Sequence, residues 1–178
     1  MDFGTIGAGA IGRGIATHLV TAGHRVVLGN RRGPDAPTGM VTGTVTRLGP
    51  STTAGTVAGT AAAETVLLAV RWQDIPAAPA DVSSWDGRSL ADTGGQVTGL
   101  TPAHHVDLGA ETGGESVARH APGAVKVFTT PYAQDPVPDP RHAEGRRFLF
   151  CAGDGAGAKA AFGSVADELG FAPVHAGR

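Results

Sequence analysis

Two short segments near the N-terminus have residue types and spacing suited to binding a phosphate-bearing ligand. The first is Gly7-Ala8-Gly9-Ala10-Ile11-Gly12, a glycine spacing typical of turns that cradle a diphosphate. Gly7 permits a tight turn, Gly9 lets the backbone approach a diphosphate without a Cβ, and Gly12 lets a helix pack closely on a strand. The free N–H groups at the start of that helix would hold the anion.

The second segment is Asn30-Arg31-Arg32. Sites for NAD usually carry an acidic residue at this position to bind the ribose hydroxyls, whereas here no acid occurs before Asp35. Two guanidinium groups suit a ribose 2′-phosphate, through charge-assisted hydrogen bonds or by stacking on adenine. The two segments together predict NADPH as the ligand. The alternative for the arginines is a solvated basic turn.

The elements that must position these segments follow from hydrophobic periodicity. A strand at residues 2–6, a helix at 11–22 closed by Gly23, and a strand at 25–29 make one βαβ unit. Further strands are predicted at 52–54, 64–70, 88–92, 124–128, 147–152 and 171–175. Further helices are predicted at 57–63 and 115–120, and after residue 154, where Asp154 is the expected cap. Residues 35–49 fit a strand by composition and a weak helix by periodicity, and we favour the helix.

Alternating strands and helices predict an α/β fold, a Rossmann-like doubly wound, mostly parallel sheet. Residues 1–178 are expected to form a single dinucleotide-binding domain, with 141–178 as a small strand–helix–strand extension. Residues 93–114 read as a long loop and 131–140, with four prolines, as a connector. The ligand site should lie beyond the carboxyl ends of the strands.

Composition excludes several classes of protein. The net charge of −2 argues against general nucleic-acid binding, and no apolar run is long enough for a membrane span or a signal peptide. The single cysteine, Cys151, forms neither an internal disulfide nor a zinc site. His104 and His105 have no carboxylate at ligand spacing, so no metal site is expected. We expect a globular cytoplasmic protein.

Several further segments, in order along nearly the whole chain, resemble the NADP-dependent oxidoreductases of the deazaflavin coenzyme F420 type. Gly-Asn-Arg-Arg-Gly-Pro at 29–34 and Leu-Ala-Val-Arg-Trp at 68–72 carry the resemblance. It continues through residues 113–123 and Val-Lys-Val-Phe-Thr-Thr at 125–130, and closes with 152–159 and 169–177. Three features depart from the family pattern. Arg71 replaces the usual proline, Thr93-Gly94-Gly95 stands where many relatives carry Asn-Pro, and the sequence ends at Arg178, where relatives commonly continue into one more helix.

The resemblance implies hydride transfer between NADP(H) and the deazaflavin, whose ring lies against the nicotinamide. It implies two groups of site residues. Cofactor contacts would come from Gly7, Gly9, Ala10, Ile11, Gly12, Asn30, Arg31, Arg32, Ala69 and Val70. The nicotinamide and acceptor rings would lie near Trp72, Thr129, Thr130 and Pro131. A tryptophan at the start of a helix, such as Trp72, is more often core or rim packing, and the two threonines fit equally well as ordinary strand-end residues. A homodimer stays open.

Two classes of function stay open. The first is an NADP-dependent oxidoreductase that reduces the deazaflavin or another planar acceptor, such as a flavin or a small imine. Such chemistry belongs to the cofactors, so we expect no catalytic acid or base and no metal, with a small-molecule acceptor as the partner in the reaction. The second is a non-catalytic NADPH-binding sensor or subunit.

Overall fold

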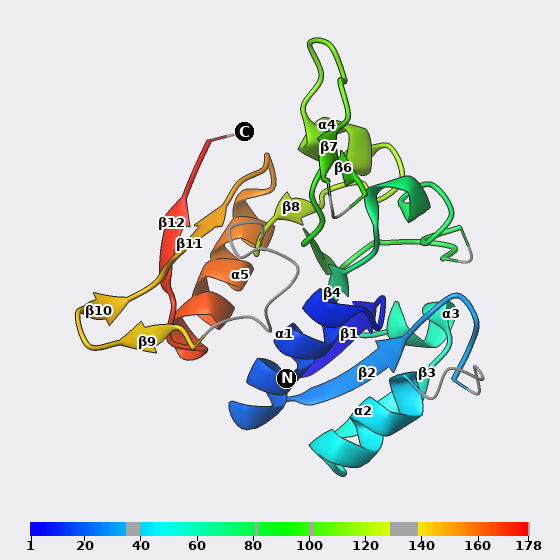
Figure 1. Cartoon of the computed structure of the whole chain (residues 1–178), viewed down its shortest axis with the longest axis vertical. Coiled ribbons are helices and arrows are strands. Elements are labelled where there is room, and N and C mark those ends of the chain that lie inside the picture. The colour runs from blue at the N-terminus through cyan, green and yellow to red at the C-terminus, as the bar shows by residue number, and fades with distance from the viewer. Residues whose placement is uncertain (35–39, 81, 100–101, 129–138, 178) are drawn as a thin grey trace.

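The computed structural model describes residues 1–34, 40–80, 82–99, 102–128 and 139–177. Its centre is a six-stranded parallel sheet with strand order β3-β2-β1-β4-β5-β8 (Figure 1). These strands are β1 (Asp2–Ile6), β2 (Arg25–Gly29), β3 (Thr52–Gly55), β4 (Thr65–Leu68), β5 (Ser89–Asp92) and β8 (Val125–Lys126). The chain runs outward from β1 to β3, then returns to start a second half at β4. This order is that of a Rossmann-type doubly wound sheet and confirms the predicted fold class.

Helices cover both faces of the sheet. They are α1 (Ala10–Thr21), α2 (Met40–Leu48), α3 (Val57–Thr60), α4 (Gly113–Ala118) and α5 (Ala156–Glu168), with a short 3-10 turn, η1 (Trp72–Asp74). The strand β4 is buried at every position, and its side chains alternate between two clusters. Leu67 packs with α1 and α5, whereas Val66 and Leu68 pack with α3 and α4 on the other side. The continuous apolar run of this strand is therefore that of a sheet covered on both faces.

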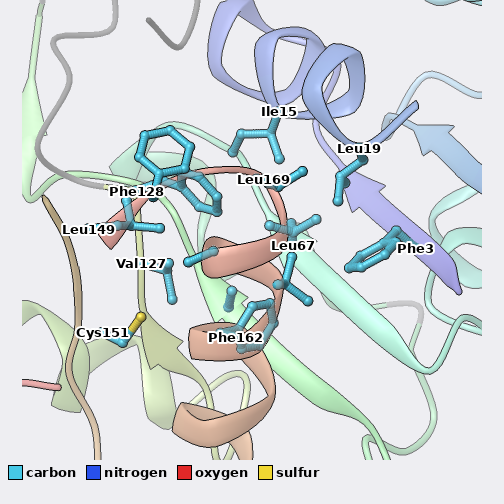
Figure 2. Packing of buried hydrophobic residues seen from close by; sticks show 14 of the residues in the cluster. Phe3, Ile15, Leu19, Leu67, Val127, Phe128, Leu149, Cys151, Phe162 and Leu169 are labelled. Carbon is cyan, nitrogen blue, oxygen red and sulfur yellow. The ribbon is translucent and has the colours of Figure 1, made fainter. Parts of the chain in front are cut away.

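The larger cluster joins the N-terminal and C-terminal parts of the chain. Figure 2 shows Phe3 of β1 and Leu19 of α1 close to Leu67, with Phe162 and Leu169 of the C-terminal segment packed against them. Burial of these side chains on a common sheet face is favourable at about 25 cal/mol per Å² of apolar surface. Helix α5 thus packs on the six-stranded sheet, although the strands on either side of it in the sequence belong to a separate two-stranded sheet.

Those two strands, β11 (Phe148–Cys151) and β12 (Ala172–His175), pair in parallel with each other as a separate sheet. One antiparallel bridge, between Lys126 and Ala152, links this sheet to β8. The predicted strand–helix–strand extension is present, but its predicted cap is wrong. Gly155 occupies the N-cap position of α5 without a side-chain hydrogen bond, one residue beyond Asp154. Whether residues 1–178 behave as one domain stays a prediction.

Other boundaries differ from those predicted. Residues 93–114 contain a small antiparallel hairpin of β6 (Val97–Thr98) and β7 (His104–His105). Helix α4 begins two residues earlier than predicted, because Thr112 and Glu115 form a reciprocal capping box. A second hairpin, β9 (Arg141–His142) with β10 (Gly145–Arg146), precedes β11. Residues 35–39 of the ambiguous segment and 131–138 of the proline connector lie outside the described residues, and residues 40–48 form the predicted helix.

Candidate cofactor site

A cavity of about 490 Å³ opens at the carboxyl ends of β1, β2 and β4. The two halves of the sheet meet between β1 and β4, where the strand order reverses, and ligands of doubly wound folds bind at that switch point. The residues that line the cavity are Ile6, Gly7, Ala8, Gly9, Asn30, Arg31, Arg32, Val57, Ala69, Val70, Arg71, Asp74 and Ala78.

Backbone hydrogen bonds hold the three strand ends together around the cavity. The N–H of Gly7 donates to the carbonyl of Gly29 at 2.8 Å, and the N–H of Ala69 donates to the carbonyl of Ile6 at 2.8 Å. The guanidinium of Arg13, on α1, donates to the Ala8 carbonyl at 2.9 Å and fixes the turn before the helix. The cavity wall therefore rests on the rigid sheet.

The three glycines of the turn meet different surroundings. Gly7 has a φ of 114°, and a Cβ there would overlap the carbonyl of Ala69. A Cβ on Gly12 would overlap the carbonyl of Gly7, so helix and strand can approach only because this residue is glycine. Gly9 differs from both, because its φ is −71° and a Cβ would have no protein atom within 4 Å apart from its own neighbours along the chain. The fold itself does not require glycine at position 9.

That open space lies at the N-terminus of α1. The first intrahelical hydrogen bond runs from the N–H of Arg13 to the carbonyl of Gly9 at 3.0 Å, so the preceding N–H groups have no acceptor within the helix. Such groups, at the positive end of the helix dipole, attract an anion. The space beside Gly9, next to N–H groups that have no acceptor within the helix, therefore suits the diphosphate of a dinucleotide.

The turn after β2 presents two arginines to the cavity. The Asn30 side chain accepts a hydrogen bond from the backbone N–H of Arg32 at 2.7 Å, and the Asn30 carbonyl accepts one from Gly33 at 3.0 Å. Asn30 therefore shapes the turn, while both arginine side chains stay exposed. This arrangement leaves the two guanidinium groups available for an anionic ligand.

The opposite wall contains residues that the sequence did not single out as ligands. Arg71 and Asp74 face the cavity and form an ion pair, with 2.8 Å between the Arg71 Nε and an Asp74 carboxylate oxygen. Val57 and Ala78 add apolar surface. The i, i+3 spacing of Arg71 and Asp74 could have indicated an ion pair, but only the position of the cavity shows that this pair faces a ligand site.

Seven of the ten predicted cofactor residues line the cavity: Gly7, Gly9, Asn30, Arg31, Arg32, Ala69 and Val70. Ala10, Ile11 and Gly12 do not line it; they form the first turn of α1, with Gly12 buried and Ile11 packed against the larger cluster. Trp72 does not line the cavity; it packs against the cluster that contains Val66 and Leu68, on the α3 and α4 side of the sheet. Thr129, Thr130 and Pro131 lie outside the described residues.

A polar cluster lies further along the same edge of the sheet. Asp92 ends β5, Lys126 ends β8, and 2.5 Å separates the ammonium from the carboxylate. Sequence reasoning missed this pair, because the residues are 34 positions apart and only the strand register brings them together. Among the residues that the structure describes, no group of three or more His, Cys, Asp or Glu side chains could hold a metal ion.

Comparisons with known proteins agree with this geometry. The model of the family described as "NADP oxidoreductase coenzyme F420-dependent" matches residues 2–95. A hypothetical protein from Sinorhizobium meliloti is 31% identical with a TM-score of 0.88, over 99% of this chain and 85% of that one. A proposed F420-dependent NADP reductase from Arthrobacter sp. FB24 is 25% identical with a TM-score of 0.80, over 97% and 83% of the two chains.

More distant structures share only the fold. A reductive aminase from Aspergillus terreus, solved in complex with NADPH, is 15% identical with a TM-score of 0.66, over 97% of this chain and 54% of its own. A comparison with curated protein sequences found no match. No helix formed by the described residues is long and apolar enough to cross a membrane.

Proposed function

The chain belongs to the family of coenzyme F420-dependent NADP oxidoreductases, and on that premise we propose that its cavity binds NADPH for hydride transfer to a deazaflavin coenzyme. When bound, NADPH supplies a hydride from its nicotinamide ring. The observation that carries the proposal is the pairing of two features in one cavity. The unobstructed Gly9 lies at a helix N-terminus, and Arg31 and Arg32 lie at the end of β2.

The diphosphate and the 2′-phosphate of the cofactor each have matching residues in this proposal. The first turn of α1, with Gly9, Ala10, Ile11 and Gly12, receives the diphosphate through backbone N–H groups. Arg31 and Arg32 bind the ribose 2′-phosphate. Ala69 and Val70, at the end of β4, present a small apolar surface next to the turn.

The position of the hydride acceptor follows from the order of the strand ends along the crevice. If the 2′-phosphate binds beside β2, the nicotinamide lies on the β4 and β5 side, where we place the acceptor with Trp72, Thr129, Thr130 and Pro131 near it. Hydride transfer between two flat rings asks the protein for orientation and exclusion of water rather than for a proton donor. We therefore expect ketones and aldehydes, which need protonation of an alkoxide, to be poor substrates.

The test mixes purified protein with NADPH and the oxidised deazaflavin coenzyme. We expect the visible absorbance of the deazaflavin and the near-ultraviolet absorbance of NADPH to fall together, and the Gly9→Val variant to show neither change. Efficient reduction of a carbonyl compound without a deazaflavin signal would show that the acceptor is wrong. Binding of NADPH without turnover of deazaflavin, flavin or imine would favour a non-catalytic sensor.

A further inference from the structure

The ion-paired side chains of Asp92 and Lys126 bind both the backbone N–H and the backbone carbonyl of Gly94. One carboxylate oxygen of Asp92 contacts the Lys126 ammonium at 2.5 Å, and the other accepts from the N–H of Gly94 at 2.9 Å. The same ammonium donates to the carbonyl of Gly94. The three residues thus form a closed ring in which the two side chains fix Gly94 from both ends.

The Asp92 end of this ring is buried in apolar surroundings, whereas the Lys126 side chain is 21% exposed. Asp92 is only 2% exposed, and its chain neighbour Ala91 and the flanking Val125 and Val127 are fully buried. Burying the Asp92 carboxylate costs several kcal/mol of lost hydration, and a well-packed apolar pair is often as stable as a buried ion pair. Stability alone is therefore a weak reason to keep a lysine and an aspartate here.

The pair holds a turn with little stiffness of its own. Residues 93–95 are Thr-Gly-Gly, and glycine loses more backbone entropy on ordering than any other residue. Thr93 anchors one end, because its N–H and its hydroxyl both donate to the carbonyl of Leu68 at 3.0 Å. Beyond Thr93, Gly94 is held by its hydrogen bonds with Asp92 and Lys126.

The turn lies against the wall of the cofactor cavity. A Cβ on Gly94 would lie 3.2 Å from the carbonyl oxygen of Val70, and Val70 lines the cavity. Residues 93–95 also follow β5, which is next to β4 on the side away from Arg31 and Arg32. The turn is therefore at the end of the crevice where the reacting rings are placed under the proposed function.

We propose that Asp92 and Lys126 are positioning residues that hold the turn at 93–95 against Val70 and so shape the acceptor end of the crevice. This inference rests on the proposed function. Neither side chain lines the cavity, so they act through the backbone of Gly94. Displacement of a reacting group by about 1 Å can lower a rate by about a hundredfold, so a loosened turn should be visible in turnover.

Two variants separate positioning from folding. Lys126→Met leaves the buried Asp92 carboxylate without its cation and should lower the melting temperature. The double variant Asp92→Asn/Lys126→Met buries no charge and keeps an amide oxygen for the N–H of Gly94, so it should recover much of that stability. It does not restore the donor to the Gly94 carbonyl. Lys159→Met, on α5 and outside the cavity lining, is the matched control.

The experiment measures NADPH binding, deazaflavin turnover and hydrogen exchange of the peptide containing residues 93–95. For Lys126→Met and for the double variant we expect faster exchange in that peptide and about ten- to a hundredfold lower kcat/KM for the deazaflavin. The dissociation constant for NADPH should stay within about threefold, a difference below 1 kcal/mol. Lys159→Met should change none of the three.

Other outcomes overturn the proposal. If exchange at 93–95 is unchanged in both variants, the pair does not hold the turn. If the double variant recovers turnover together with its melting temperature, the pair is only structural. Failure of the proposed function looks different, because the wild-type protein would then bind NADPH without reducing the deazaflavin. The exchange measurement and the reduction of whichever planar acceptor is turned over would then decide whether the pair holds the turn.

Discussion

Gly12 packs so closely on Gly7 that any side chain at position 12 would overlap the Gly7 carbonyl. Two residues before Gly12, the chain leaves the turn and enters α1, and a side chain added to Gly9 at that boundary would point into open space. The glycine turn therefore contains positions required by the fold and one position that is free for a ligand. Substitutions can separate the two roles.

Gly9→Val should abolish NADPH binding and leave the fold intact. The valine methyl groups would enter the space needed by the diphosphate, whereas the φ of −71° at this residue suits any amino acid. Circular dichroism should show a native spectrum and fluorescence titration should show no binding. Gly12→Ala is the matched control, and it should be destabilised, because its Cβ has no room. Unchanged NADPH affinity in Gly9→Val would mean that the turn is only structural.

Arg31→Ala/Arg32→Ala should weaken NADPH binding much more than NADH binding. Charge-assisted hydrogen bonds contribute about 1.5–3 kcal/mol each, so the loss for NADPH should be at least about tenfold. Dissociation constants for both dinucleotides give the comparison, and Arg47→Ala, on the exposed side of α2, is the control. An equal loss for both dinucleotides would contradict a role in selecting the 2′-phosphate.

Asp74→Asn should tighten NADPH binding and Arg71→Ala should weaken it. The two side chains form an ion pair on the cavity wall, so loss of Asp74 frees a cation there, and loss of Arg71 leaves a carboxylate to repel the phosphates. Exposed pairs contribute about 0.2–1 kcal/mol, so changes of about two- to fivefold are expected, decreasing with added salt. The dissociation constant for NADPH should fall in Asp74→Asn and rise in Arg71→Ala. A change in the same direction in both variants would show that these charges do not act on the bound cofactor.

Cys151 should react with thiol reagents only when the protein unfolds. Burial raises the pKa of its thiol, so less of the reactive thiolate is present at a given pH, and the side chain is fully buried in the larger cluster. Timed labelling at neutral pH should be slow in buffer and rapid in denaturant. Fast labelling of the native protein would show that the segment around β11 opens readily.

The binding turn could be read from the sequence because its signals are local. A strand, a glycine turn and a helix within about 30 residues confine each other, and the arginines at 31 and 32 follow the second strand directly. The capping box of Thr112 and Glu115 was equally local, and the predicted start of α4 missed it. Local hydrogen bonds and turn geometry depend on neighbouring residues, so the sequence alone determines them.

Tertiary structure decided which distant residues join that turn. The pairing of β1 with β4 brings Ala69 and Val70 beside Gly7, and no local pattern states that these strands are neighbours. The register of β5 with β8 likewise makes a pair of Asp92 and Lys126. Strand order and register follow from burying both faces of the whole sheet at once, a global free-energy balance that no single segment contains.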